Sequence, residues 1–144
     1  MEAEVLEFIQ NALGDNSEIH VKLEKGRLQE KDLMLVKALT GKDCSGFVRT
    51  LDKFAVRHVF KNHGDEGKER SRGQFPIAQE DFLLIEIVVN EYDLVFSEIN
   101  KLGNIILHYE KNFEHFRLVY VEEIRNKRGE IALQTLYKQK TRKP

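Results

Sequence analysis

Two histidines and two fixed cations lie within the run Arg57–Gly64, whose residues are Arg-His-Val-Phe-Lys-Asn-His-Gly. Two imidazoles can share the proton transfers of phosphodiester cleavage: one takes the proton from a ribose 2′-hydroxyl, and the other returns a proton to the leaving oxygen. A nearby Lys or Arg stabilises the additional negative charge of the pentacoordinate phosphorus. The residue types in this run therefore predict acid–base cleavage of a phosphodiester, for which no metal is needed.

The spacing of the two histidines leaves alternatives open. His58 and His63 are five residues apart, about 140° around a helix, so both face one cavity only if the helix ends near Asn62 and Gly64 turns His63 back. His63 could instead complement the helix dipole at a C-terminus. His58 could be a hydrogen-bonded core histidine, because helical periodicity places it on one apolar stripe with Leu51, Phe54, Ala55 and Val59.

Two further segments carry polar chemistry. Thr135 and Tyr137 project from the same side of a predicted strand, where a hydroxyl can bind a phosphate oxygen and a phenol can stack or position a proton. Both are also ordinary strand formers. Arg72 lies in a glycine-rich run that could bind backbone phosphates or simply form a turn before the next helix.

Metal and cofactor sites are not expected. The chain has five histidines and one cysteine, but no histidine pair has the i, i+4 spacing of a zinc-binding helix and none has a cysteine partner. We therefore predict no metal site and no cofactor.

Length and composition favour one domain. The chain has 144 residues, of which 41% are hydrophobic, enough for a core without disulfide staples. The single cysteine, Cys44, excludes an internal disulfide framework, and the start lacks the profile of a signal peptide. No apolar run approaches the length of a membrane span. We expect a cytoplasmic protein with no membrane association.

Charge is distributed unevenly along the chain. Residues 125–144 carry seven Lys or Arg and one Glu, whereas the first 124 residues carry a net charge of −7. A basic end could contact phosphates, or it could be a solvated terminus.

Hydrophobic periodicity predicts the elements that must position these residues. The expected class is α+β, with N-terminal helices packed on one face of a curved antiparallel sheet whose last three strands form a meander. Thr50 is the expected helix cap, and Gly64 the expected left-handed residue after that helix. Ile131, Leu133, Thr135 and Tyr137 are expected to share one side of the last strand. The expected helices are 1–13, 50–62 and 76–90, the strands are 19–23, 33–39, 104–111, 115–123 and 130–138, and residues 64–75 form a mobile loop.

Several of these motifs together resemble a known nuclease class. The runs 58–65 (His-Val-Phe-Lys-Asn-His-Gly-Asp), 72–77 (Arg-Gly-Gln-Phe-Pro-Ile), 80–82 (Glu-Asp-Phe) and 135–138 (Thr-Leu-Tyr-Lys) are similar to the phage-type nuclease domains of the barnase/EndoU/colicin/RelE class. The resemblance covers roughly residues 45 to 140.

The resemblance implies a metal-independent endoribonuclease of phage or prophage toxin type that leaves a 2′,3′-cyclic phosphate. By the same resemblance His58 and His63 would be the proton-transfer pair, Thr135 and Tyr137 would lie at the scissile phosphate, and Lys138 would be an electrostatic partner. Charge and strand parity add four RNA-binding candidates: Lys61, Arg72, Lys111 and Arg117. The alternative is a catalytically inactive, phage-derived binding module on the same scaffold.

The expected organisation has three parts within one globule. Residues 1–44 form an N-terminal extension with a helix and short strands, residues 45–140 form the nuclease-like domain, and residues 141–144 form a basic tail. RNA is the expected substrate, and an immunity or phage protein is a possible partner. The first helix could also pack against its copy in a homodimer.

Overall fold

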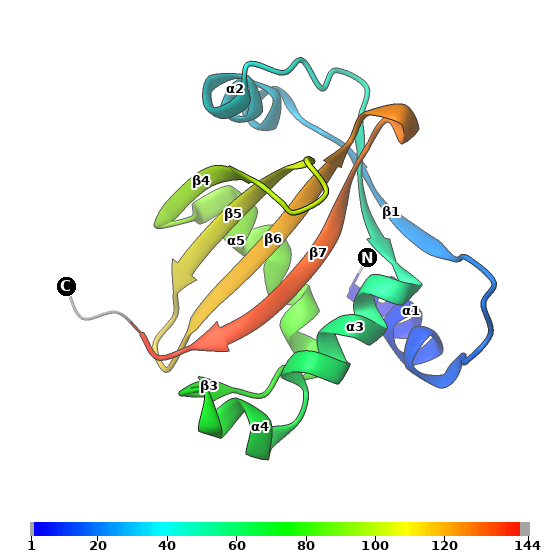
Figure 1. Ribbon diagram of the computed structural model, residues 1–144, viewed down its shortest axis with the longest axis vertical. Helices are drawn as coiled ribbons and strands as arrows, with labels where there is room; N and C mark the ends of the chain where they lie inside the picture. Colours follow the sequence, from blue (N-terminus) through cyan, green and yellow to red (C-terminus); the bar gives the residue numbers. More distant parts are fainter. Residues whose placement is uncertain (1, 142–144) are drawn as a thin grey trace.

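A mostly antiparallel sheet dominates the computed structural model, which describes residues 2–141 (Figure 1). Its strand order is β1-β2-β7-β6-β5-β4, with β3 paired to the end of β7; β2 and β7 run parallel, and the other pairs are antiparallel. The strands are β1 (Lys22–Arg27), β2 (Val48–Asp52), β3 (Gln74–Phe75), β4 (Leu94–Ile99), β5 (Ile105–Asn112), β6 (Arg117–Arg125) and β7 (Glu130–Gln139). The predicted α+β class and the C-terminal meander are confirmed, and β4 extends the meander by one strand that the sequence analysis missed.

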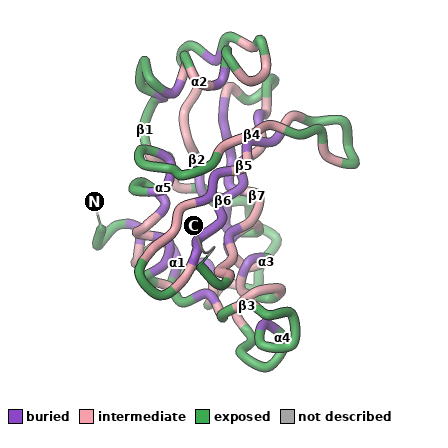
Figure 2. Tube along the Cα trace, turned by 90° about the vertical axis from the view of Figure 1, so that its left-hand side faces the viewer, coloured by how far each residue is buried: buried purple, intermediate pink, exposed green. Residues whose placement is uncertain are grey.

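Helices cover one face of this sheet. They are α1 (Glu2–Gly14), α2 (Glu30–Thr40), α3 (Lys53–His63), α4 (Glu66–Ser71) and α5 (Ile85–Glu91), with 3₁₀ turns η1 (Gln79–Leu84) and η2 (Asn126–Arg128). The main core forms where α1, η1 and α5 pack on the sheet, and Figure 2 shows buried residues along β5 and β6. We call this side the covered face. Its sheet residues include Leu107, Tyr109, Leu118, Tyr120, Ile131, Leu133 and Leu136.

The opposite side carries a second, smaller apolar cluster. Ile106, Val119 and Val121 are buried there, and Tyr137 packs against them. We call this side the open face.

Four predicted elements differ from the structure. Residues 33–39 are helical, not a strand, because the Asp32 carboxylate accepts a hydrogen bond from the Gln29 N–H at the start of α2 and Gly41 closes the helix with φ of 77°. Residues 64–75 form α4 and β3 rather than a loop, and residues 76–90 are divided into η1 and α5. The strand predicted at 19–23 begins only at Lys22 and continues to Arg27.

The boundaries of α3 also differ from the prediction. Thr50 lies in β2, and Asp52 caps α3 instead, because its carboxylate accepts from the N–H groups of Phe54 and Ala55. Gly64 follows the helix but has φ of −97°, so it is not left-handed. A Cβ at Gly64 would lie 2.6 Å from the Phe60 carbonyl oxygen, so close approach is what requires glycine here.

Two sequence predictions fall partly outside the described residues. The helix predicted from residue 1 is described from Glu2, and residues 142–144 of the predicted basic tail lie beyond the described range. The apolar face of α1, which a helix-mediated dimer would need, is buried within the chain through Val5, Ile9 and Ala12.

Candidate functional site

The middle of β7 meets α3 along its edge. β2 pairs with the first part of β7, Glu130–Ala132, and β3 pairs with its last part, Lys138–Gln139. The stretch between these pairings is contacted by α3, which lies beside β7 (Figure 1). Side chains of α3 and β7 therefore meet at this edge of the sheet.

His63 contacts β7 through a ring stack. Its imidazole lies on the Tyr137 ring, with centroids 5.3 Å apart and planes inclined by 30°. The Nδ1 atom lies 3.2 Å from Oε2 of Glu69, which is fully buried, and the other Glu69 oxygen accepts a 2.7 Å bond from Arg72. A carboxylate at Nδ1 fixes the orientation and tautomer of the ring and leaves Nε2 for proton transfer.

His58 is exposed at a hollow on the same edge. Its Nε2 lies 2.8 Å from Nδ2 of Asn62, one helical turn away. The hollow has a volume of about 490 Å³, and Gln134 and Arg125 are among the residues that line it together with His58.

The prediction that His58 points into an apolar stripe is wrong. The buried positions of α3 are Lys53, Val56 and Val59, which repeat at helical spacing on a different side of the helix from His58.

A β-bulge in β7 decides which face of the sheet its side chains occupy. Val121 pairs with Thr135 and the next residue, Glu122, pairs with Leu133, so Gln134 is an extra residue in β7. The bulge reverses the alternation: Ile131 and Leu133 face the covered side, whereas Thr135 and Tyr137 face the open side. The prediction that these four residues share one side is wrong, although Thr135 and Tyr137 do share one.

The two histidines lie at successive places along this strand. His58 is beside the hollow at Gln134, and His63 contacts Tyr137. Three strand residues span about 10 Å, and the five helical residues from His58 to His63 rise about 7.5 Å. The structure thus brings both imidazoles to the edge between α3 and β7.

Comparison with protein families places the chain in a family. Residues 26–144 match the family described as phage-Barnase-EndoU-ColicinE5/D-RelE like nuclease 3. The chain belongs to this phage-type nuclease family. A search of the curated proteins returned no match, and neither did a search of the solved structures.

The predicted RNA-binding and electrostatic cations of this family member are distributed over both faces of the sheet. Lys138 forms a 2.8 Å ion pair with Asp81 and lies over the Phe116 ring, on the covered side. Lys111 donates to the Glu91 carbonyl oxygen and lies opposite Leu118, also on the covered side. Neither lies beside Thr135.

The remaining cations lie nearer α3 or on the open face. Lys61 is exposed on α3, and Arg72 donates to the Asn62 carbonyl oxygen at 2.6 Å. Arg117 lies on the open face, where it pairs with Glu110 at 3.1 Å. Lys61 and Arg72 are therefore the two predicted cations that lie on α3 or bond to it.

Sequence reasoning missed several residues of this site. Asn62 was detectable, because i and i+4 residues are neighbours on a helix. Glu69 and His20 had no such signal: Glu69 reaches His63 across the bend at Gly64, and His20 reaches the hollow from residues before β1. Gln134 was also missed, because its position depends on how β7 pairs with β6.

A second polar cluster lies on the covered face of the sheet. Arg49 from β2 reaches across β7 to Glu122 of β6, with bonds of 2.8 and 3.1 Å, and the Tyr109 hydroxyl donates to the same carboxylate at 3.1 Å. Burial, reinforced by the charge of Glu122, raises the pKa of Tyr109 and of Tyr120. This cluster connects three strands, and it lies on the face of the sheet opposite Thr135 and Tyr137.

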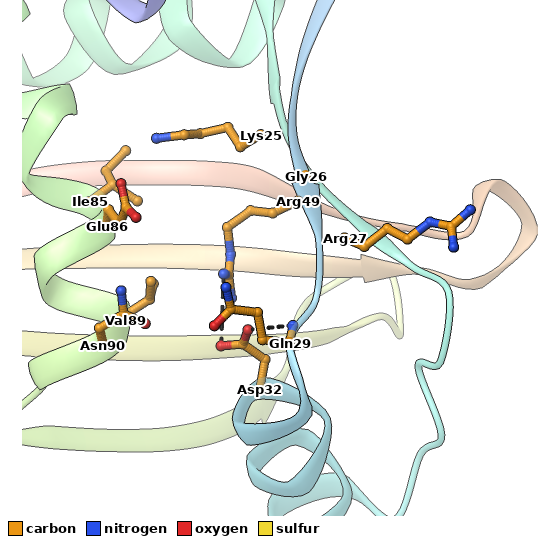
Figure 3. Close-up of a pocket in the computed structure, with 10 residues that line it drawn as sticks. All are labelled: Lys25, Gly26, Arg27, Gln29, Asp32, Arg49, Ile85, Glu86, Val89 and Asn90. Carbon is orange, nitrogen blue, oxygen red and sulfur yellow. Dashed lines mark hydrogen bonds and ion pairs between the residues drawn. The ribbon is translucent and has the colours of Figure 1, made fainter. Parts of the chain in front are cut away.

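A cavity of about 90 Å³ lies beside this cluster. Lys25 lines it, and burial lowers the pKa of that ammonium group. Asp32 lies 3.9 Å from Arg49 at the same cavity, so acidic and basic groups alternate around it (Figure 3).

Residues 2–141 contain neither a candidate metal cluster nor a candidate membrane span. No group of three or more His, Cys, Asp or Glu side chains there has a metal-binding arrangement. No helix in the same range combines the length and hydrophobicity that a membrane crossing requires.

Proposed function

We propose that this family member is a metal-independent endoribonuclease whose active site lies at the edge between α3 and β7. The observation that carries the proposal is the His63 ring, stacked on Tyr137 and oriented by the buried Glu69 carboxylate. His58 lies on the same helix and lines the neighbouring hollow, and it is the second imidazole that the reaction needs.

The proposed reaction divides two proton transfers between the rings. Nε2 of His63 removes the proton from a ribose 2′-hydroxyl, whose oxygen then attacks the adjacent phosphorus. The bond from phosphorus to the 5′-oxygen breaks, and protonated His58 donates its proton to that oxygen. The products are a 2′,3′-cyclic phosphate and a 5′-hydroxyl. Glu69 stabilises the His63 imidazolium, and Asn62 can face His58 with either amide atom, which suits both protonation states.

Tyr137 and Thr135 are proposed to bind the phosphate oxygens. Burial raises the pKa of Tyr137, and the charges of Glu110 and Glu98 raise it further. The phenol therefore keeps its proton and acts as a hydrogen-bond donor. Thr135 presents a hydroxyl on the same face of β7.

RNA contacts outside the reacting phosphate are proposed for Lys61 and Arg72. Lys61 lies in the C-terminal half of α3. Arg72 follows α4 and donates to the Asn62 carbonyl oxygen and to Glu69. Arg117 and Lys111 remain predicted RNA contacts.

The test is cleavage of single-stranded and transfer RNA by the purified protein in EDTA. We expect a 2′,3′-cyclic phosphate product, identified by mass spectrometry, and no cleavage where the nucleotide at the cleaved bond carries a 2′-deoxyribose. His58→Ala and His63→Ala are expected to lose about 10²- to 10⁴-fold in rate, the range for general acid–base groups. His115→Ala is the matched control, because His115 is 83% exposed in the β5–β6 turn.

Absence of cleavage of either RNA by wild type, with the fold intact by circular dichroism, would overturn the proposal. So would full activity of both histidine variants.

One observation favours the non-catalytic binding module as second candidate. Asp81 pairs with Lys138 and Glu110 with Arg117, so two predicted phosphate-binding cations are neutralised within the chain. A binding module predicts salt-dependent RNA or phage-protein binding by wild type that is unchanged in His58→Ala and His63→Ala.

A further inference from the structure

The hollow beside His58 has the size of a small-ligand site. Its volume of about 490 Å³ falls within the range of roughly 300–1,000 Å³ that small-ligand sites occupy. Its walls come from the first turn of α3, the paired ends of β6 and β7, and the turn between β4 and β5. Residues distant in sequence thus enclose one space on the same edge as the proposed reaction.

One wall of the hollow is aromatic and apolar. The His20 ring stacks on Phe54, with centroids 6.0 Å apart and planes at 25°. His20 is held in place by the Asp52 carboxylate, which also caps α3. Phe54 is 40% exposed, and Leu102, at the tip of the β4–β5 turn, is 84% exposed. Exposed rings and apolar side chains of this kind stack on the bases of single-stranded RNA.

The other wall is polar. The side-chain oxygen of Gln134 is buried and accepts no hydrogen bond from residues 2–141. A glutamine amide has both donors and an acceptor, so it can bind the edge of a base once its terminal torsion turns. Arg125 lies beside it, fixed by Glu123 at 3.0 Å and Glu130 at 3.5 Å.

We propose that this hollow is a nucleobase subsite that binds the base of the nucleotide adjacent to the phosphate served by His58. His20, Phe54 and Leu102 form its stacking wall, and Gln134 binds the base edge. The inference rests on the proposed function, because His58 is what connects the hollow to a phosphate. His20 precedes residue 26, so part of this wall lies outside the family match.

The test is calorimetric titration with the four nucleoside 5′-monophosphates and with ribose 5-phosphate, which carries the phosphate at the same position but has no base. We expect at least one nucleotide to bind about tenfold more tightly than ribose 5-phosphate, within the range that base stacking supplies. Gln134→Ala and Leu102→Ala are expected to remove most of this difference. Leu102 is exposed in a turn, so its variant keeps the fold even if Gln134→Ala does not.

Gln139→Ala is the matched control. Gln139 is a second β7 glutamine whose side-chain oxygen accepts no hydrogen bond from the described part of the chain, and it lies away from the hollow, opposite Gln74. We expect its nucleotide binding to equal that of wild type.

Equal binding of nucleotides and ribose 5-phosphate would overturn the subsite. Unchanged base-dependent binding in both Gln134→Ala and Leu102→Ala would overturn it as well. These failures differ from failure of the proposed function: base-dependent binding without RNA cleavage would retain the subsite and remove the ribonuclease. Cleavage without any base-dependent binding would do the opposite.

Discussion

The rings of His63 and Tyr137 stack across the contact between α3 and β7, with centroids 5.3 Å apart. The contact joins the last residue of a helix to a residue on the open face of β7 that follows it by 74 positions in the chain. Stacking uses the ring of Tyr137 and leaves its hydroxyl available. The positioning of His63 and the proposed hydrogen bond to phosphate can therefore be separated experimentally.

Tyr137→Phe should keep the stack and remove only the hydroxyl. A hydrogen bond to a charged group contributes about 1.5–3 kcal/mol, so we expect kcat for RNA cleavage to fall about 10- to 100-fold. The melting temperature should be nearly unchanged. Tyr92→Phe, at an exposed ring near Tyr109, is the control and should retain full activity. Full activity of Tyr137→Phe would remove the phenol from the mechanism.

Glu69→Gln tests whether the buried carboxylate orients His63. The variant keeps the shape of the side chain but removes the charge that stabilises the imidazolium, so we expect kcat to fall by about 10-fold or more and the pH–rate profile to shift. The measurement is the rate of oligonucleotide cleavage between pH 5 and pH 9. Glu66→Gln is the control, because Glu66 belongs to the same short helix and is exposed. A lower rate with an unshifted profile would point to a structural role for Glu69 alone.

The sequence was most informative where one period extended over a whole element. Alternation located β5, β6 and β7, and helical spacing located α1. It failed at α2, where the apolar run of residues 33–39 resembles a buried strand and only the Asp32 cap and Gly41 reveal the helix. Short elements such as α4 and β3 have too few residues for any period to be recognised.

The site was less predictable, because tertiary contacts create it. Thr135 and Tyr137 were placed on one side correctly, but their side relative to Leu133 depends on the bulge at Gln134, which pairing with β6 determines. His58 and His63 were identified by residue type. Glu69 orients His63 and the His20 ring borders the hollow, but both come from segments whose own sequence patterns say nothing about His58 or His63.

Glu122→Gln should destabilise the fold strongly. Glu122 is fully buried and accepts hydrogen bonds from Arg49 and Tyr109, so the variant leaves a buried guanidinium without its main partner. Loss of one member of a buried ion pair costs about 3–5 kcal/mol, which urea unfolding would measure.

Two variants make this stability measurement interpretable. Glu114→Gln, at an 87% exposed side chain, should leave the free energy of unfolding nearly unchanged. The double variant Arg49→Met/Glu122→Leu removes both charges and should be more stable than Glu122→Gln. A Glu122→Gln protein as stable as wild type would show that the ion pair contributes nothing net.

Ser17→Ala should weaken the protein's resistance to acid. The Ser17 hydroxyl and backbone N–H bond to Asp15, and with Lys53 they lower the pKa of Asp15 from 3.8 to about 2. Because the folded pKa lies below the unfolded value, this stabilisation is complete above about pH 4 and is lost as the pH falls towards 2. Removing the Ser17 hydroxyl raises the pKa of Asp15 in the folded state, so acid unfolding should begin at a higher pH.

Carbon-detected NMR titration of Asp15 would measure the pKa, and circular dichroism would measure the acid unfolding. Ser45→Ala is the control, since Ser45 bonds to Asp43 in a similar turn and should shift only the pKa of Asp43. An unchanged Asp15 titration in Ser17→Ala would contradict the prediction, because it would show that the Ser17 hydroxyl does not lower the pKa of Asp15.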